Sequence, residues 1–132
     1  MPQDCIFCKI AVGDIPSATI YEDDKIKVFL DINPVTKGHS LIIPKAHYQM
    51  MADTPSDLLA HVFSKAQELM VVIKEALEAD FVALSVVGVD VPHFHVHLIP
   101  RRHDDGLSNW WPTGKYDKGE MEQYVQKIKQ AF

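Results

Sequence analysis

Short apolar runs and alternating apolar and polar positions mark much of the chain as strands. Five strands are expected, at residues 18–22, 25–32, 39–44, 81–88 and 93–100. The first two alternate, and Asp23-Asp24 between them predicts a hairpin turn. The run at 81–88 is apolar almost throughout, a pattern that is typical of a buried strand.

Apolar residues at intervals of three and four predict one long helix and two short ones. The three helices are expected at residues 5–12, 54–79 and 120–132. Asp4 and Thr54 stand where the side-chain caps of the first two would lie, and Gly13 ends the first. Residues 103–117, rich in Asp, Gly, Trp and Pro, predict a loop before the last helix.

The order of these elements predicts the fold class. Most strands follow one another through hairpin-type links, and few helical crossovers are available to make parallel pairs. The expected fold is therefore α+β, with a five-stranded, mostly antiparallel sheet, one long helix and two short helices. A length of 132 residues suits a single domain with a core of its own.

Charge and composition exclude some partners. The chain has 13 basic and 18 acidic residues, and this balance argues against a surface that follows the phosphates of long DNA or RNA. A small nucleotide needs only a few convergent groups and is not excluded. The start, MPQDCIFCKI, does not have the pattern of an export signal, and no run reaches the apolar length of a membrane span. We expect a cytoplasmic protein that does not bind membranes.

Three of the seven histidines alternate with apolar residues in PHFHVHLIPRR (92–102). On a strand, His93, His95 and His97 share one face, and the apolar residues between them face the core. A solvent-facing edge that happens to carry polar residues is a weak explanation for three histidines in succession. The pattern favours a site built on imidazole chemistry.

Two chemistries are open to such a row of imidazoles. One zinc ion bound by all three is disfavoured, because the outer Cα atoms lie roughly 13 Å apart on a strand and Zn–N bonds are about 2.0–2.1 Å. A phosphate fits better, since rings ~6.6 Å apart can flank its oxygens while the central ring reaches phosphorus. Histidine titrates near neutrality, so one neutral ring can attack while a neighbour stays cationic.

The same residues, with others in order and spacing, resemble the histidine-triad (HIT) nucleotide-binding family. The match runs over most of residues 4–101 and consists of HFHVHLI (93–99), CIFCKI with Ile15-Pro16, YEDD (21–24), FLDINPVTKGH (29–39) and LIIPKAH (41–47). The resemblance implies a single HIT-like domain over 1–132, in which the C-terminal segment of about 103–132 varies among members. It implies a hydrolase or nucleotidyl transferase that cleaves a substituted nucleoside α-phosphate. Purine nucleoside phosphoramidates and dinucleoside polyphosphates are the implied substrates, and a nucleotidyl-histidine is the implied intermediate.

The resemblance also implies roles for single residues. His95 matches the nucleophile, His97 a partner that binds and orients the phosphate, and His39 a further histidine that supports the triad. Asp31 matches the acid that accepts hydrogen bonds from the ribose hydroxyls. The apolar slot for the base maps to Ile6, Phe7, Ile10, Phe29 and Ile32, which without the family would all be assigned to the core.

Cys5 and Cys8 are the two cysteines of the chain, in C-x-x-C spacing. From the residues alone, a redox pair, a metal clip and two buried small residues all remain open. The N-terminus resembles the zinc-containing, bacterial-type branch of nucleoside phosphoramidate hydrolase-like members. That resemblance implies a structural zinc ion held by Cys5, Cys8, His47 and His93, and it requires no catalytic metal. His95 and His97 would then be free for the phosphate.

The chain departs from the family before the triad. Many members have Gly-Gln-(Ser or Thr)-Val there, and this chain has Gly88-Val89-Asp90-Val91. Asp90 thus places a carboxyl near the leaving group of the substrate. It would act as a general acid if its pKa were raised, repel a phosphate, or cap a turn.

The remaining expectations concern partners and rival functions. The family resemblance implies a homodimer whose sheet continues across the two-fold axis. Trp110 and Trp111 indicate either a contact surface or core packing. Two rival functions remain open: a nucleotide-binding or scaffold protein with incidental turnover, and a three-histidine metalloenzyme.

Overall fold

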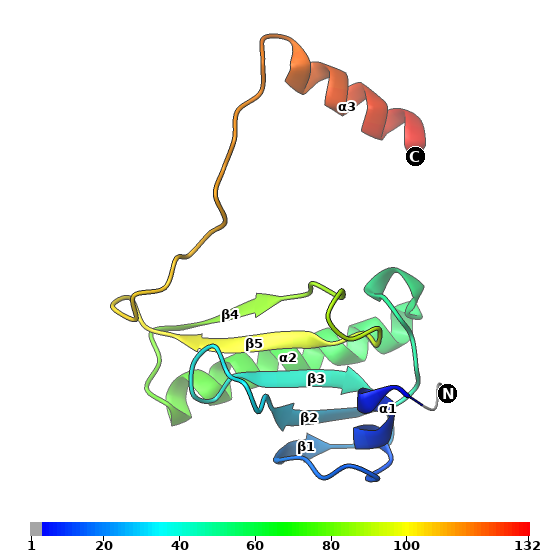
Figure 1. The fold of residues 1–132 in the computed structure, drawn as a ribbon, viewed down its shortest axis with the longest axis vertical. Coiled ribbons are helices and arrows are strands. Elements are labelled where there is room, and N and C mark those ends of the chain that lie inside the picture. The colour runs from blue at the N-terminus through cyan, green and yellow to red at the C-terminus, as the bar shows by residue number, and fades with distance from the viewer. Residues whose placement is uncertain (1–3) are drawn as a thin grey trace.

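The computed structural model describes residues 4–132 and contains one sheet of five strands in the order β1-β2-β3-β5-β4. All neighbouring strands are antiparallel. The strands are β1 (Thr19–Glu22), β2 (Ile26–Leu30), β3 (Ser40–Pro44), β4 (Phe81–Ser85) and β5 (Val96–Arg101). The helices are α1 (Ile6–Ala11), α2 (Ser56–Ala76) and α3 (Glu120–Ala131), with a short 3-10 turn η1 (Met51–Asp53) (Figure 1). The predicted α+β class, with a five-stranded antiparallel sheet and one long and two short helices, is confirmed.

The two faces of the sheet are covered differently. The apolar side of α2, with Val62, Ala66 and Leu69, packs on one face in a core that continues through the strands to Phe94 and Leu98. The short helix α1 covers part of the opposite face, where a second buried cluster contains Phe7 and Cys8 among others. Alternation along the strands thus sends one set of side chains to α2 and the other set toward α1.

The last strand begins later than the sequence predicts. Ladder pairing starts at Val96, and the segment before it forms other backbone hydrogen bonds. The His93 N–H donates to the Val91 carbonyl at 2.8 Å, and the Phe94 N–H donates to the Tyr48 carbonyl at 2.7 Å. His93 and His95 therefore precede β5, but their side chains still alternate with Phe94, which is buried against α2.

The predicted helix caps are also wrong in detail. Cys5, rather than Asp4, occupies the N-cap of α1, and its sulfur accepts from the Cys8 N–H at 3.4 Å. At α2 the N-cap position is Pro55, and the Thr54 hydroxyl donates to the Met50 carbonyl at 2.9 Å instead. At α2 the Met50 carbonyl thus competes for the side chain that the local pattern assigns to the cap.

Asp23 fixes the β1–β2 hairpin and joins it to α2. Its carboxylate accepts from the Lys25 and Ile26 N–H groups at 2.8 Å each. It also accepts from the Tyr21 hydroxyl at 2.9 Å and from His61 Nε2 at 2.8 Å. Partial burial raises the pKa of Asp23, but these four hydrogen bonds outweigh burial and hold the pKa well below its usual range. His61 is therefore part of a structural contact.

This network predicts a pH-dependent difference in stability between wild type and a variant that lacks the Asp23 carboxylate. The pKa of Asp23 is lower in the folded protein than in the unfolded chain. Its carboxylate therefore contributes to the free energy of unfolding above the unfolded pKa of about 3.9, and this contribution is lost as pH falls toward the folded pKa. We expect Asp23→Asn to lower the free energy of unfolding by about 1–3 kcal/mol at pH 7. The gap between the two proteins should shrink below about pH 4 in urea titrations. A gap that stays constant from pH 7 to pH 3 would contradict this assignment.

The C-terminal segment leaves the body of the domain. Arg101, at the end of β5, is buried and pairs with Asp105 at 2.6 Å, which anchors the start of the segment. The following residues extend away to α3, and none of the residues of α3 is buried (Figure 1). None of the described helices combines the length and apolar character that a crossing of the bilayer requires.

Candidate functional site

A hollow of about 280 Å³ opens on the sheet face that carries α1. Its lining includes every residue that the sequence analysis assigned to substrate binding, together with two of the three residues assigned to catalysis. These are Ile6, Phe7, Ile10, Phe29, Asp31, Ile32, Asp90, His95 and His97. The third catalytic candidate, His39, lies behind His97. Residues from α1, β2, the loop after β2 and β5 thus converge on one site.

His95 lines this hollow, and its Nε2 is the ring nitrogen that is free of backbone contacts. Its ring is buried, and Nδ1 lies 2.7 Å from the His93 carbonyl oxygen. A carbonyl only accepts, so Nδ1 carries a proton, and the lone pair of the attacking form of the ring is on Nε2. Among the described residues, Nε2 has no hydrogen-bond partner. Phe7 packs edge-on against the ring at a centroid distance of 5.0 Å and limits its rotation.

Backbone and side-chain contacts fix the protons on the next two histidines. The Val35 N–H donates to His39 Nδ1 at 3.1 Å, so His39 carries its proton on Nε2. That proton is donated to His97 Nδ1 at 2.9 Å. His97 in turn carries its proton on Nε2, where it is available to a ligand in the hollow. His39 therefore positions His97 and has no place in the lining itself.

The local environment keeps this pair neutral. Burial lowers the pKa of His97, and the neighbouring His95 and His39 lower it further. Burial also lowers the pKa of His39, against a smaller opposing effect of Asp31. Because both shifts are downward, the neutral tautomers described above are the forms present at neutral pH.

Asp31 lies where β2 ends and the chain turns into the loop. One carboxylate oxygen accepts from the Asn33 N–H at 2.9 Å, and the other lies 3.8 Å from His39 Nε2. The side chain is partly exposed to the hollow, so its oxygens retain capacity to accept further hydrogen bonds. A pair of neighbouring hydroxyls is a suitable donor for such a carboxylate.

The apolar part of the hollow has a buried floor and an exposed rim. Phe7 and Phe29 are buried and pack edge-to-face at 5.8 Å between centroids, with Ile10 beside them. Ile6 is 45% exposed and Ile32 is 91% exposed, so these two are rim residues and not core residues. The interpretation of all five as core, reached without the family, is therefore wrong for Ile6 and Ile32.

Cys5, Cys8, His47 and His93 converge at the N-terminus of α1. Cys8 Sγ lies 3.2 Å from His47 Nδ1 and 3.5 Å from His93 Nδ1. Cys5 Sγ lies 3.4 Å from His93 Nδ1, and the two Nδ1 atoms lie 3.2 Å apart. One donor atom from each of the four residues lies within 4.8 Å of all the others.

These distances fit a tetrahedral zinc ion. Bonds of about 2.0–2.1 Å to nitrogen and 2.3 Å to sulfur give ligand–ligand edges of about 3.3–3.8 Å. His93 Nε2 lies 2.8 Å from the Pro44 carbonyl, so it donates its proton there and leaves the Nδ1 lone pair for a metal. Burial and the adjacent Cys5 raise the pKa of the Cys8 thiol to about 11. A divalent cation among the four donors would offset that cost of forming thiolates.

The three triad histidines do not converge on one point. The donor atom of His93 faces the cysteines, and His95 Nδ1 is committed to a carbonyl oxygen. Among the described residues, no candidate metal cluster contains all three. This arrangement argues against a three-histidine metalloenzyme, as the spacing along a strand also indicates.

Asp90 lies at the edge of the hollow, with Oδ1 3.3 Å from His95 Nε2. Burial raises its pKa, but the N–H groups of Asp90 and Val91 and the nearby histidines outweigh burial and lower the pKa below its ordinary value. The condition under which Asp90 would act as a general acid, a raised pKa, is therefore not met. The side chain is a carboxylate at neutral pH.

Sequence reasoning missed part of the lining. Residues 15–18, Leu41 and Val91 also face the hollow. None of them carries chemistry that would mark a site, and only the Ile15-Pro16 break indicates that the chain turns there. These residues shape the wall of the hollow, and their position depends on how α1 packs on the strands.

Comparisons with known proteins agree with this arrangement. Residues 12–104 match the HIT domain family. An uncharacterized HIT-like protein of Methanocaldococcus jannaschii is 40% identical over 129 residues, which are 95% of this chain and 98% of that protein. The adenosine 5′-monophosphoramidase of Candida albicans is 34% identical, with 97% and 91% of the two chains covered. The adenylylsulfatase of Arabidopsis thaliana is 40% identical over 81% of this chain and 57% of its own length.

Solved structures agree in fold. A protein of Streptococcus mutans is similar with a TM-score of 0.90 and 32% identity, covering 99% of this chain and 87% of that one. A zinc-bound histidine-triad protein of Mycobacterium smegmatis is similar with a TM-score of 0.76 and 32% identity over 98% of both chains. Sequence and structure together show that this chain belongs to the HIT family.

Proposed function

We propose that this chain is a nucleotide hydrolase that cleaves a substituted nucleoside α-phosphate through a nucleotidyl-His95 intermediate. The observation that carries the proposal is the position of His95 Nε2, which is buried at the hollow and has no hydrogen-bond partner among the described residues. Leaving a buried polar atom without a partner costs free energy, and a reacting substrate would supply the missing contact. Two relatives with hydrolase names, the monophosphoramidase and the adenylylsulfatase, support the same class of reaction.

The reaction proceeds as two displacements at the α-phosphorus. In the first, His95 Nε2 forms a bond to phosphorus, and the bond from phosphorus to the leaving group breaks; the leaving group takes up a proton from water. In the second, a water oxygen bonds to phosphorus and releases a proton, which neutralises the hydroxide left by the first step. The phosphorus–Nε2 bond breaks, and a nucleoside monophosphate leaves. The Nε2–H of His97 donates to the phosphoryl oxygens and stabilises their developing charge.

The hollow provides a place for each part of a nucleoside. Phe7, Phe29 and Ile10 form an apolar surface against which a purine base stacks, while Ile6 and Ile32 enclose its edge. Asp31 accepts from the two ribose hydroxyls. These apolar side chains contact the face of the base and do not distinguish its hydrogen-bonding groups. Adenine and guanine nucleotides are therefore both expected to bind.

Hydrolysis of adenosine 5′-phosphoramidate tests this assignment. The purified protein should release AMP. Asp31→Asn should raise KM by about 10-fold or more, because an uncharged amide accepts hydrogen bonds from the ribose hydroxyls less strongly than the carboxylate does. The 2′-deoxy substrate should be less sensitive to the substitution than the ribose substrate. No AMP release by the wild-type protein would contradict the proposed function.

We also propose that Cys5, Cys8, His47 and His93 hold a structural zinc ion. The donor geometry and the zinc-bound M. smegmatis relative support this proposal. The ion would join α1 to the segment that precedes β5, and so position Phe7 against His95. Its ligand set is closed, which suits a structural role and leaves the phosphate chemistry to His95 and His97.

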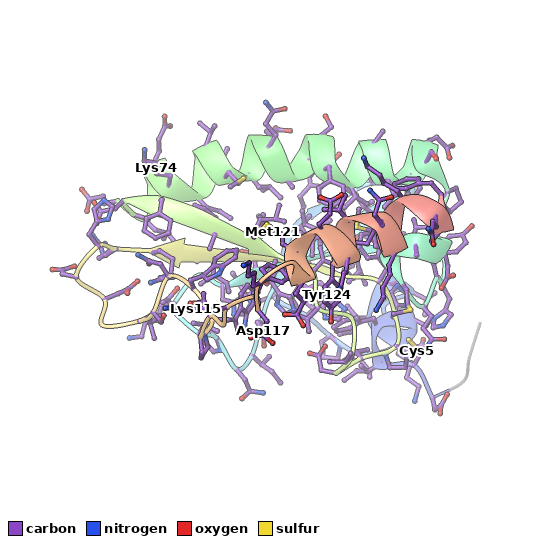
Figure 2. The ribbon with its side chains drawn as sticks, turned by 90° about the horizontal axis from the view of Figure 1, so that it is seen from above. Cys5, Lys74, Lys115, Asp117, Met121 and Tyr124 are labelled. Atoms are coloured by element: carbon purple, nitrogen blue, oxygen red, sulfur yellow. The ribbon has the colours of Figure 1, made fainter. Side chains whose placement is uncertain are left out.

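We further propose that the protein is a homodimer. Met121, Tyr124, Val125 and Ile128 form an apolar stripe at helical spacing on α3, and all four are exposed. Figure 1 shows that α3 lies away from the sheet, and Figure 2 labels Met121 and Tyr124 on this helix. Trp110 and Trp111 are 69% and 67% exposed and pack against each other at 5.3 Å. A second copy would cover these surfaces, and β4, which is an edge strand of the described sheet, would allow pairing across a two-fold axis.

The apolar stripe of α3 gives a test of the dimer. Tyr124→Asp should shift the protein from dimer to monomer in light scattering after gel filtration, because a charge in an apolar interface is costly. Gln123→Asp, on the same helix but outside the stripe, adds the same charge and should leave the dimer intact. A wild-type protein that runs as a monomer at micromolar concentration would contradict the proposed dimer.

A further inference from the structure

A second hollow, of about 420 Å³, adjoins the nucleotide site. Ile6, Asp90 and Val91 line both hollows and form the border between them. A molecule that extends from the first hollow into the second therefore passes Asp90. The other residues around the second hollow are Asp4, Cys5, His47, Gln49 and Pro92.

The second hollow is negatively charged. Its lining contains two carboxylates, Asp4 and Asp90, and no lysine or arginine among the described residues. The Asp90 side chain is 62% exposed, so it is accessible to a ligand. Its contacts with the Asp90 and Val91 N–H groups, described above, keep it ionised at neutral pH.

The position of Asp90 relative to the nucleophile brings this charge to the reacting bonds. A phosphorus atom about to be attacked lies about 3–3.5 Å from Nε2 of His95. Asp90 Oδ1 lies 3.3 Å from the same nitrogen. A substituent of the phosphorus that extends into the second hollow therefore lies close enough to Asp90 for its charge to interact with the carboxylate.

We propose that the second hollow receives the leaving group and that Asp90 selects leaving groups that carry a positive charge. This inference rests on the proposed function. An ammonium group on a departing amine is attracted to Asp90 and Asp4, whereas a carboxylate or a polyphosphate chain is repelled. The substrate class is therefore nucleoside phosphoramidates of cationic amines, with dinucleoside polyphosphates as poor substrates.

A pair of matched substrates tests the selection. The adenosine 5′-phosphoramidates of 1,3-diaminopropane and β-alanine share the same phosphorus–nitrogen bond and similar length, and differ in the charge at the far end. We expect wild type to prefer the diaminopropane compound in kcat/KM by at least about 10-fold, which is the scale of one charge pair at the edge of a solvated site. Asp90→Asn, which keeps the shape of the side chain, should reduce this ratio about 10-fold.

Two controls separate the charge of Asp90 from other effects. Asp104→Asn removes the same charge from an exposed position in the loop beyond the far end of β5, and should leave the wild-type ratio unchanged. The preference of wild type should also fall as salt is raised from 0.02 to 0.5 M, estimated from screening lengths of about 20 Å down to about 4 Å. This second measurement does not depend on any variant.

The outcomes distinguish this inference from the proposed function. Equal kcat/KM for the two substrates in wild type, or a preference that neither salt nor Asp90→Asn alters, would overturn the selection by Asp90 while the hydrolase activity stands. If wild type hydrolyses neither compound nor the unsubstituted adenosine phosphoramidate, the proposed function itself fails. A ratio that falls both with salt and in Asp90→Asn supports the inference.

Discussion

His95→Ala should abolish turnover of adenosine phosphoramidate, with a loss in kcat of at least about 10⁴-fold, on the scale of other enzymes that lose their nucleophile. His95 Nε2 faces the hollow and has no hydrogen-bond partner among the described residues. His97 cannot replace it, because its Nδ1 is occupied by His39 and its Nε2 carries the proton. Removing His95 therefore removes the first of the two displacements. Steady-state release of AMP measures the effect.

The variant should still bind nucleotide. The proposed base and ribose contacts of Phe7, Phe29 and Asp31 do not involve the imidazole of His95, so AMP should bind within a few-fold of wild type in calorimetry. His103→Ala, at an exposed histidine beyond the far end of β5, is the matched control and should keep full activity. If His95→Ala hydrolyses the substrate as fast as wild type, the rival interpretation is favoured, in which the chain binds nucleotides and its turnover is incidental.

Cys8→Ser should release the zinc ion and lower the midpoint of thermal unfolding by more than about 10 °C, because structural zinc supplies several kcal/mol of folding free energy. Cys8 is buried and lies against both His47 and His93, so its loss opens the tetrahedral set. The metal content, measured by mass spectrometry of the purified protein, should fall from one zinc per chain to near zero. Cys5→Ser should have a similar effect, as it removes another ligand of the same ion.

Chelation distinguishes a structural zinc from a catalytic one. Below the unfolding temperature of the metal-free protein, a chelator should leave substantial hydrolysis, because no reaction step passes through the ion. Activity that disappears on chelation while the fold persists, and returns with metal, would support a metalloenzyme instead. A wild-type protein that contains no zinc, with an unfolding midpoint that chelators do not change, would contradict the proposed metal site.

Alternation along the chain was enough to predict which residues share a face, because the side-chain period of an extended segment is fixed. His95 and His97 face the α1 side as predicted, and Phe94 faces α2. The point where β5 begins was not predictable in this way. It depends on a hydrogen bond from Phe94 to Tyr48, a residue 46 positions away along the chain. Local patterns contain no information about such a partner.

The family resemblance named the site residues, but the tautomers of the histidines come from tertiary contacts. The proton on His97 is set through His39 by the Val35 N–H. The charge of Asp90 follows from backbone donors of its own turn. In the same way, the contact of His61 with Asp23 joins α2 to the turn of a hairpin that is distant in sequence. These properties arise when elements pack, and they decide the chemistry of each group.

The central claim is that the reaction passes through a covalent bond between phosphorus and His95 Nε2. Excess wild-type protein should be mixed with adenosine phosphoramidate for milliseconds to seconds and quenched at alkaline pH, where a phosphoramidate bond survives. Peptide mass spectrometry should then find an adenylate group on His95, formed and lost at rates that match turnover. Release of AMP with no adduct at any time, or an adduct on another residue, would contradict the mechanism.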